Sequence, residues 1–460
     1  MKMMRKMLMA TMLCAAAPLL AETPFTVDFS QEVGAIKKLN GICNAAPLNG
    51  TQKGGLEKEI AALKIPFYRF HDAALENPGY ALVDVTRIFP LFHLDADDAR
   101  NYNFEVTDDY IRGCVESGAK IDFRLGESIE HARKNYRVNP PKDFEKWAEI
   151  CAHIVRHYNA GWAKGFHWNI EYWSVWEEPD NPELLTGDSY EKVYFPLYAA
   201  TVKRLKREFP GVKVGGPNCM GPWNSFDKFI DYCAANALPL DFACWTRYAR
   251  RPEEYFDEVV RVRKFLNERG YAKTEININE WHLAPVSWSG FGSIGSARHG
   301  AEWLRELTAT PSVVFVDATL IKMQDAPVDA MFYYSMKTSS WGIFDSRKQP
   351  RGHYYALKAF APLAEDGTRV AAPTCPDRGW YQLASKGKDG RGHVLLAALH
   401  AEGDPRLVLK GGVKPVSVQV IDTVRNLEPV ADWNWNGKVL RIPRLYSDSC
   451  VWLVEVEPAE

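Results

Sequence analysis

Cysteine pairs, nucleotide-binding motifs and long apolar runs are missing from this sequence. Of its 460 residues 9 are cysteine, and no two form a Cys-x-x-Cys pair, which argues against a structural zinc site. No G-x-G-x-x-G motif follows the first predicted strand and no P-loop signature occurs, so nucleotide binding is not expected. The first predicted strand also lacks the His-x-His pair that a metal-dependent barrel hydrolase needs.

The composition is that of an ordinary globular protein. The chain is 46% hydrophobic and 25% charged, which excludes a disordered, collagenous or coiled-coil protein. Its length is too great for one small core and fits one large domain with a smaller one. No internal repeat or low-complexity linker separates them.

The first 21 residues have the features of a secretory leader. Three basic residues precede an apolar run from Met7 to Leu20, and Ala21 offers a small residue before a cleavage point. The run is shorter than the ~20 residues of a membrane-spanning helix, and no later run is long enough. We therefore expect residues 1–21 to be a signal peptide, and the mature protein to be secreted or periplasmic without a membrane anchor.

The net charge is slightly negative. The chain has 56 Lys and Arg against 58 Asp and Glu, a formal charge of −2, and loss of the leader takes it to about −5. Nucleic acids and anionic membranes bind basic patches, so neither is an expected partner. A neutral substrate fits better. Export would also permit disulfides, and Cys375 with Cys450 is the pair to test first, with buried free thiols as the alternative.

Residues 36–362 alternate short β-branched or aromatic runs with longer amphipathic segments, the pattern of repeated βα units. The predicted strands are Leu39–Cys43, Pro66–Phe70, Lys120–Leu125, Tyr172–Trp176, Lys213–Gly215, Asp241–Trp245, Glu275–Asn279 and Ala330–Ser335. The predicted helices are Leu56–Leu63, Asp108–Ser117, Asp143–Tyr158, Tyr190–Phe209, Phe226–Asn236, Pro252–Arg269, Ser296–Leu307 and His353–Phe360. This alternation predicts an α/β fold, a (β/α)8 TIM barrel over residues 22–362, with a doubly wound open sheet as the alternative.

Beyond residue 362 the pattern changes to short runs of period two. These runs are Val394–Leu399, Arg406–Leu409, Val416–Ile421, Val439–Ile442 and Val451–Val456, separated by turn residues. They predict a C-terminal β-sandwich domain over residues 363–460, packed on the barrel. Residues 22–35, with a strand at Phe25–Phe29, are a candidate addition to that sandwich.

Two strand ends carry the acidic residues of interest. The fourth predicted strand ends in Trp176-Glu177-Glu178-Pro179 and the seventh in Asn279-Glu280-Trp281-His282. The carboxyl ends of barrel strands share one rim, so these carboxylates face each other across the barrel mouth. A single Glu there is more often a helix cap or a surface charge. A pair about 5 Å apart, one protonated and one ionised, is the arrangement that cleaves a glycosidic bond.

Motifs along most of the chain resemble those of glycoside hydrolase family 39 and its clan A relatives, which include β-xylosidases and α-L-iduronidases. They are Leu39-Asn-Gly-Ile-Cys, Tyr68-Arg-Phe-His, Trp176-Glu-Glu-Pro, Asp241-Phe-Ala-Cys-Trp, Asn279-Glu-Trp and Gly342-Ile-Phe-Asp. The family's Trp-Asn-Glu-Pro motif places its acid/base on Glu178, fixed by Pro179. Its nucleophile falls on Glu280. The resemblance implies a retaining glycosidase that forms a covalent glycosyl-enzyme intermediate and acts on oligo- or polysaccharides, β-xylosidase-like, without cofactor or metal.

Two positions depart from the family pattern. Glu177 stands where the family has an Asn that hydrogen-bonds the sugar 2-hydroxyl, and Thr246-Arg247-Tyr248 lacks the His that often precedes the Tyr. The charge of Glu177 is expected to raise the pKa of Glu178 and to suit a different or cationic substituent. Either specificity has moved or activity is reduced. The alternatives are therefore a catalytically impaired carbohydrate-binding barrel and a retaining glycosidase of iduronidase-like or endo-acting specificity.

Other strand ends supply candidate substrate-binding residues beside Glu177. Arg69 is expected to hold the nucleophile ionised, with a structural salt bridge as the alternative. His71 is either a contact to a sugar hydroxyl or a packed neutral histidine. By resemblance, Tyr248 donates a hydrogen bond to Glu280 and orients it, with plain aromatic packing as the alternative.

Tryptophans at strand ends are candidate platforms for sugar rings. An indole ring stacks on the C–H face of a sugar while its N–H group bonds a hydroxyl, although packing in the core is as common. The candidates are Trp176, Trp223, Trp245, Trp281 and Trp341. Trp341 is the best of them, and Trp281 and Trp341 complete the predicted substrate-binding set.

Overall fold

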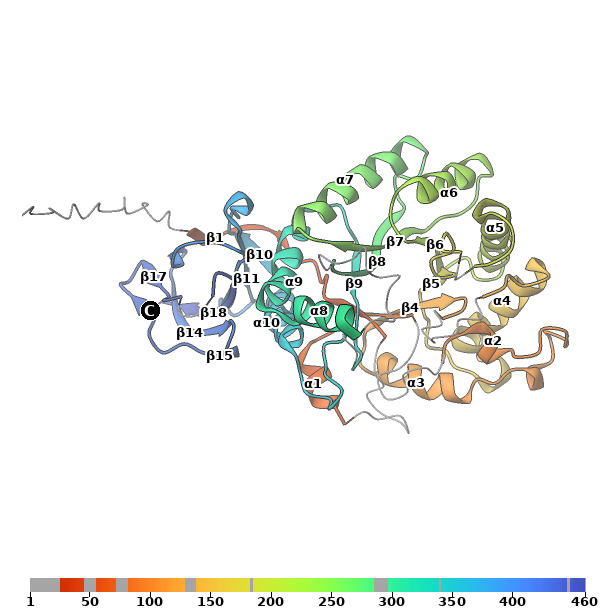
Figure 1. Ribbon diagram of the computed structural model, residues 1–460, viewed down its shortest axis with the longest axis horizontal. Coiled ribbons are helices and arrows are strands. Elements are labelled where there is room, and N and C mark those ends of the chain that lie inside the picture. Colours follow the sequence, from red (N-terminus) through yellow and green to blue (C-terminus); the bar gives the residue numbers. More distant parts are fainter. Residues whose placement is uncertain are drawn as a thin grey trace, which may run out of the picture.

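The computed structural model describes residues 25–44, 55–71, 82–128, 138–182, 185–284, 297–338, 341–444 and 447–459. It consists of a closed barrel and a second, separate β-sheet, which lie side by side (Figure 1). In these ranges no helix combines the length and the apolar character that crossing a membrane requires. The predicted leader lies outside the described residues.

Eight parallel strands form the barrel in sequence order, and the last pairs with the first. They are β2 (Gly41–Cys43), β3 (Phe67–Phe70), β4 (Lys120–Leu125), β5 (Tyr172–Val175), β6 (Lys213–Cys219), β7 (Phe242–Ala249), β8 (Glu275–Leu283) and β9 (Ala330–Tyr333). Each overlaps one predicted strand, so the predicted (β/α)8 barrel is confirmed. The open-sheet alternative is wrong because the sheet closes on itself.

The α-helices include one at each of the eight predicted places. They are α1 (Glu57–Ala62), α2 (Val85–Ile88), α3 (Glu105–Glu116), α4 (Phe144–Ala160), α5 (Tyr190–Glu208), α6 (Asn224–Ala235), α7 (Pro252–Glu268), α8 (Ala297–Thr308), α9 (Thr310–Lys322) and α10 (Gly352–Asp366). Short 3-10 turns lie at η1 (Ala99–Asn101), η2 (Trp162–Lys164), η4 (Met323–Asp325) and η5 (Pro376–Arg378).

Local chemistry sets the ends of these helices. Helix α4 begins at the Asp143 side chain, which accepts hydrogen bonds from the backbone N–H groups of Glu145 and Lys146 at 3.0 and 3.1 Å. It ends at Gly161, whose φ of 74° is the left-handed conformation that glycine adopts without strain.

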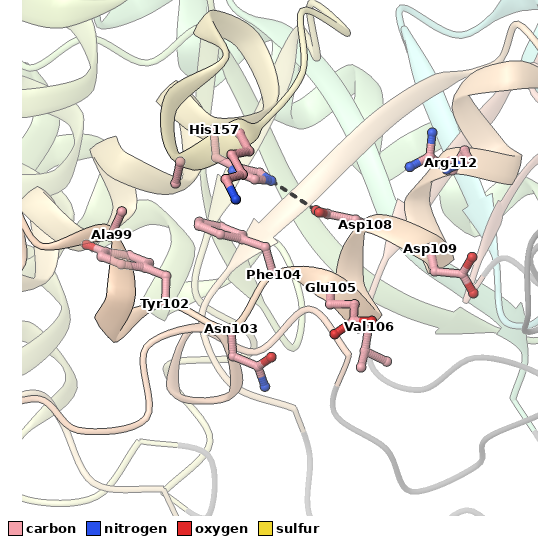
Figure 2. A pocket seen from close by; sticks show the side chains of 12 residues that line it. Ala99, Tyr102, Asn103, Phe104, Glu105, Val106, Asp108, Asp109, Arg112 and His157 are labelled. Atoms are coloured by element: carbon pink, nitrogen blue, oxygen red, sulfur yellow. Dashed lines mark hydrogen bonds and ion pairs between the residues drawn. The ribbon is translucent and has the colours of Figure 1, made fainter.

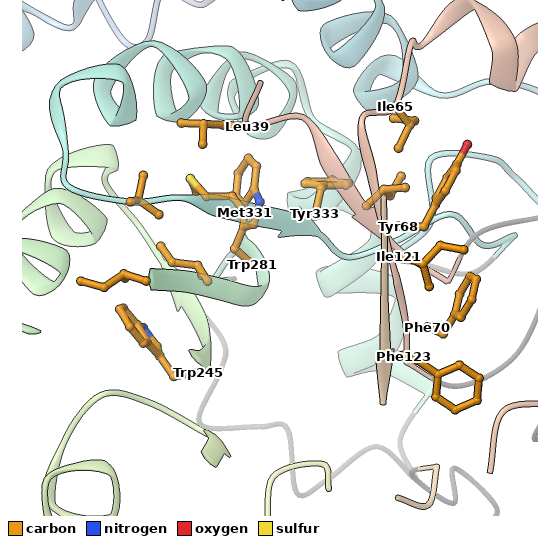
Figure 3. Close-up of a cluster of buried hydrophobic side chains, with 14 of the residues drawn as sticks. Leu39, Ile65, Tyr68, Phe70, Ile121, Phe123, Trp245, Trp281, Met331 and Tyr333 are labelled. Carbon is orange, nitrogen blue, oxygen red and sulfur yellow. The ribbon is translucent and has the colours of Figure 1, made fainter. Parts of the chain in front are cut away.

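Along each barrel strand, every second side chain points outward and packs against the helices. In β4, Ile121 and Phe123 pack outward in this layer, whereas Asp122 and Arg124 alternate with them. Figure 3 shows part of the outer layer, including Trp245 and other aromatic residues of several strands. The alternate, inward side chains therefore supply the polar groups of the barrel interior.

The second sheet has ten strands in the order β15-β14-β18-β12-β11-β10-β1-β13-β17-β16. They are β1 (Phe25–Ala35), β10 (Thr368–Ala371), β11 (Trp380–Lys386), β12 (Gly392–Ala398), β13 (Arg406–Lys410), β14 (Val413–Ile421), β15 (Asn426–Pro429), β16 (Asn434–Trp435), β17 (Val439–Arg441) and β18 (Cys450–Pro458). Strand β1, from the start of the described chain, pairs antiparallel with β10 and parallel with β13.

Each face of this sheet has its own core. In β12, Val394 and Leu396 belong to a cluster that also contains Val420 of β14 and Leu440 of β17. Strands β14 and β17 lie near opposite ends of the strand order, so the sheet folds over and closes on this cluster in the manner of a sandwich. Leu395, the intervening residue of β12, packs instead with the barrel's core.

The eight cysteines in the described ranges are free thiols. Cys375 is exposed and Cys450 is buried. The disulfide considered between these two residues is therefore not formed.

Candidate active site

Five of the predicted site residues come together at the carboxyl ends of the barrel strands. Arg69 lies in β3 and His71 directly follows it, Glu177 and Glu178 follow β5, and Glu280 lies in β8. All five are buried, with at most 9% of any residue exposed. Parallel strands carry their ends to the same rim, which is why residues 211 positions apart in the chain meet here.

Arg69 forms a buried ion pair with Glu177. Its Nη2 donates to Oε2 of Glu177, and its Nη1 lies 3.9 Å from Oε2 of Glu280. Burial alone would raise the pKa of Glu177, but the charges of Arg69 and His71 outweigh it and lower this pKa to about 2. Glu177 is therefore a fixed anion, and one guanidinium faces two carboxylates.

His71 stands between the same two carboxylates. Its Nε2 lies 2.7 Å from Oε2 of Glu280 and its Nδ1 lies 3.4 Å from Oε2 of Glu177. Arg124 fixes the backbone at this point, since its Nε and Nη2 donate to the His71 carbonyl at 3.0 and 2.5 Å. Burial would lower the pKa of His71, yet the Glu177 and Glu280 charges raise it to about 10. The geometry thus favours an imidazolium at neutral pH.

Glu178 has the opposite electrostatic setting. Its pKa rises to about 8, first because of burial and then because of the charges of Glu280 and Glu177. The neighbouring carboxylate therefore acts in the direction expected from the sequence. At neutral pH Glu178 is therefore protonated beside an ionised Glu177, so two adjacent carboxyl groups have opposite protonation states.

Tyr248 completes the surroundings of Glu280. Its hydroxyl donates to Oε1 of Glu280, while His71 lies on Oε2 of the same carboxylate. Burial and the Glu280 charge raise the pKa of Tyr248, so the phenol keeps the proton that it donates. Both oxygens of Glu280 are held, which orients this carboxylate.

The tryptophans divide into buried and accessible residues. Trp281 is fully buried in the outer layer, where its ring contacts Tyr255 and Tyr333, so its prediction as a substrate contact is wrong. The reason is a shift in the pairing of β8 with β9 between Ile278 and Trp281, which breaks the alternation of faces. Trp176 and Trp245 are buried as well.

Of the five candidate tryptophans, two stay within reach of solvent. Trp341 is half-buried, and its ring meets those of Tyr248 and His282 edge-on at 5.3 and 5.1 Å. It therefore lies beside the carboxylates. Trp223 follows β6 and is 52% exposed, with the Arg247 guanidinium 5.3 Å from its ring centre.

Sequence reasoning missed two buried asparagines of this site, Asn218 and Asn279. Their side chains are joined by a hydrogen bond of 2.7 Å between Nδ2 of Asn279 and Oδ1 of Asn218. The position of Asn279 directly before Glu280 was the feature of the sequence that could have identified it. Asn218 lies beyond the predicted end of its strand, so the pattern gave no reason to consider it.

His71, Glu177 and Glu280 also have the geometry of a metal site, because one ligand atom from each lies within 4.8 Å of the others. Arg69 and the His71 imidazolium, however, place two positive charges against the two carboxylates. These cations supply the counter-charge that a metal ion would bring, and a metal would have to displace the proton of His71.

A separate groove of about 750 Å³ lies on the outer wall, between η1, α3 and the end of α4 (Figure 2). His157 and Asp108 are joined by a hydrogen bond of 3.0 Å in its wall, and Arg112 lies farther along α3. The groove shares no residue with the cluster at the barrel rim.

Comparison with known proteins identifies relatives among the glycosidases. Residues 78–360 match the family described as Glycosyl hydrolases family 39. A β-xylosidase of Geobacillus stearothermophilus is 26% identical over 238 residues, which cover 45% of this chain and 46%, about half, of that relative.

Solved structures share the fold across nearly the whole chain. A glucosidase from Croceicoccus marinus has a TM-score of 0.78 at 20% identity, covering 95% of this chain and 99% of that one. A family 39 β-xylosidase from Caulobacter crescentus has a TM-score of 0.70 at 16% identity, covering 95% and 100%. Since the family match covers more than half of the sequence, the chain belongs to glycosyl hydrolase family 39.

Proposed function

We propose that the protein is a retaining glycosidase that hydrolyses O-glycosidic bonds by double displacement. The observation that carries this proposal is the contrast between two buried carboxyl groups at one rim. Glu178 has its pKa raised to about 8, whereas Glu280 accepts a hydrogen bond from Tyr248 at Oε1 and lies 2.7 Å from Nε2 of His71 at Oε2. A retaining mechanism needs one proton donor and one ionised nucleophile.

In the first step, an oxygen of Glu280 attacks the anomeric carbon while Glu178 gives its proton to the leaving oxygen. The bond from the anomeric carbon to the leaving oxygen breaks, and a glycosyl ester with Glu280 forms. In the second step, Glu178 takes a proton from water, the water oxygen attacks the anomeric carbon, and Glu280 leaves as a carboxylate. Both residues return to their starting protonation states.

The cations around Glu280 serve this cycle by placing positive charge beside the oxygen atoms of the nucleophile. Arg69 and His71 both lie within ion-pair distance of Oε2 of Glu280, and Tyr248 fixes the other oxygen. We assign Glu177 to substrate contact as an acceptor only, because its pKa is about 2 and its Oε1 has no hydrogen-bond partner among the described residues. A sugar hydroxyl or a cationic substituent suits such an acceptor.

Glu177 was the reason to consider a carbohydrate-binding barrel without turnover. Arg69 and His71 balance the charge of this additional carboxylate. An unbalanced anion would repel a nearby carboxylate nucleophile and favour protonating it, whereas a balanced one leaves Glu280 able to act. This pairing favours the enzyme over the binding protein.

Trp341 and Trp223 are the proposed platforms for sugar rings. Trp341 lies on the Glu280 side, beside Tyr248. Trp223 follows the strand next to Glu178, the residue that faces the leaving group, so we place it on the leaving-group side. Its ring is held against Gly221, where an added Cβ would lie 2.2 Å from it. A fixed, exposed indole is suited to stacking on a sugar.

We propose xylosides as the substrate class, because the curated relative is a β-xylosidase. Glucosides are the alternative, because a structural neighbour is a glucosidase. The leader-like residues 1–21 support action outside the cytoplasm, where oligo- and polysaccharides are met.

The test is a panel of nitrophenyl glycosides, including β-xyloside, β-glucoside and α-L-iduronide, with wild type, Glu178→Ala and Glu280→Ala. We expect hydrolysis by wild type with retained anomeric configuration, and its loss in both variants. Azide should restore Glu280→Ala and give an inverted glycosyl azide. Sugar binding without turnover by wild type would support the carbohydrate-binding barrel instead.

A further inference from the structure

Two β-bulges lie at the barrel rim, one beside each carboxylate. The pairing of β6 with β7 passes from Pro217 to Cys219 and skips Asn218. The pairing of β7 with β8 passes from Ile278 to Glu280 and skips Asn279. A bulge frees one residue from the ladder and re-aims its side chain. Here the two freed side chains meet, since Asn279 donates to Asn218.

The amide of Asn218 has no hydrogen-bonding capacity left for a substrate. Its Nδ2 donates to the carbonyls of Trp176 at 2.7 Å and Val175 at 3.3 Å. Its Oδ1 accepts from Nδ2 of Asn279 at 2.7 Å and Sγ of Cys244 at 2.9 Å. A carboxamide has two N–H donors and two acceptor lone pairs, and all four are used. Asn218 is fully buried, so it acts within the protein.

These bonds surround the backbone that presents Glu178. Trp176 and Glu178 have φ values of 67° and 38°, which non-glycine residues seldom adopt. The Asn218 side chain holds the Trp176 carbonyl, and its backbone carbonyl accepts from the Glu178 N–H at 3.1 Å. Asn218 itself has a φ of 58°, which asparagine tolerates better than most residues. One residue thus holds the unusual segment on both sides of Glu177.

We propose that Asn218 is a positioning residue that fixes the acid/base Glu178 relative to the nucleophile Glu280, with Asn279 as its anchor on β8. This inference rests on the proposed function, because it assumes the roles given to the two carboxyl groups. Glu280 is held separately by Tyr248 and His71. Loss of Asn218 should therefore displace Glu178 and leave the nucleophile in place.

Asn218→Asp tests this directly, because an ionised aspartate has nearly the same shape and no donor for the Trp176 carbonyl. We expect kcat to fall about 100-fold for glycosides with alkyl or sugar leaving groups, the scale of a 1 Å misplacement. Dinitrophenyl glycosides leave without protonation, so cleavage to the glycosyl-enzyme should be within about 5-fold of wild type in a pre-steady-state burst. Azide should accelerate the turnover that follows, because it needs no general base.

A second measurement asks whether Asn218 acts through Glu178. In a Glu178→Ala background, Asn218→Asp should cause no further loss with dinitrophenyl substrates, since the group that it positions is gone. If Asn218→Asp does not fold, Asn279→Ser removes the anchor instead, and it should produce the same leaving-group dependence to a smaller extent.

Asn40→Asp is the matched control. Asn40 is also fully buried in the barrel and donates to the Leu63 carbonyl at 3.2 Å, but it precedes β2 at the opposite end of the strands. Asn40→Asp should leave the ratio of the rates on alkyl or sugar glycosides and on dinitrophenyl glycosides at the wild-type value. The inference would be overturned if Asn218→Asp lowered the rates on both substrate classes equally or on neither. It would also be overturned if the effects of Asn218→Asp and Glu178→Ala were fully additive. Retained hydrolysis in Glu178→Ala and Glu280→Ala would instead overturn the proposed function.

Discussion

Arg69 donates a hydrogen bond to Glu177 in a place where both side chains are closed off from solvent. The adjacent residue, Glu178, has its pKa raised while that of Glu177 is lowered. Two neighbouring carboxyl groups in the chain thus differ because only one of them faces a guanidinium.

Glu177→Gln should move the alkaline limb of kcat/KM to lower pH. Glu178 must carry a proton to act as the acid, so activity is lost as pH rises through its pKa of about 8. The Glu177 charge helps to raise that pKa, and removing the charge lowers it. The pH profile with a poor leaving group measures the change. An unmoved limb in a folded, active variant would show that Glu177 does not act on Glu178.

Arg69→Met should destabilise the protein by about 3–5 kcal/mol, because it leaves the buried Glu177 carboxylate without its main partner. The free energy of unfolding in urea gives the comparison. Lys64→Met is the control, since Lys64 pairs with Glu365 at 3.1 Å while both side chains are more than half exposed. That change should cost no more than about 1 kcal/mol. Equal costs would mean that Arg69 is not a buried electrostatic partner.

His71→Asn should lower stability in a pH-dependent way. The folded pKa of His71 is raised to about 10, above the ~6.5 of an unfolded histidine. Its contribution is therefore full below about pH 6.5 and is lost as pH rises toward 10. The difference in free energy of unfolding between wild type and variant should shrink across that window. A constant difference would indicate a packing role for a neutral ring.

Trp223→Ala should raise KM for oligosaccharides several-fold, about the 0.5–1.5 kcal/mol of one aromatic contact, and spare glycosyl fluorides, whose leaving group has no ring. Val424→Ala is the control for loss of surface apolar area, because Val424 is 63% exposed in the turn between β14 and β15. Trp223→Phe should keep most of the affinity. If Trp223→Ala affects glycosyl fluorides and oligosaccharides alike, the indole does not bind the leaving group.

EDTA should leave kcat unchanged. Arg69 and the His71 imidazolium already balance the carboxylates that have metal-site geometry. Activity measured before and after chelation and dialysis checks this. Loss with EDTA and recovery with a divalent cation would replace the proposed mechanism with a metal-dependent one.

The barrel and the two strand ends with Glu178 and Glu280 were predictable because their sequence signals are local and periodic. Helix α9 was not, because Val313–Val316 and its neighbours are apolar on every side and lack an amphipathic period. The side of the sheet on which Trp281 and Asn218 lie could not be predicted either, since both residues lie where a strand pairing shifts. A bulge breaks the two-residue alternation from which a face is inferred.

Strand β1, which joins the second sheet as the sequence predicted, determines how the chain connects that sheet to the barrel. It lies between β10 and β13, while the whole barrel sequence runs between β1 and β10. Deleting everything after Asp366 would therefore not yield an isolated, soluble barrel. Both edges of β1 would lose their partner strands, and unpaired strand edges promote aggregation. Strand β1 thus ties the start of the barrel segment to the second sheet. We therefore expect a truncation that removes one of the two parts to prevent the other from folding stably.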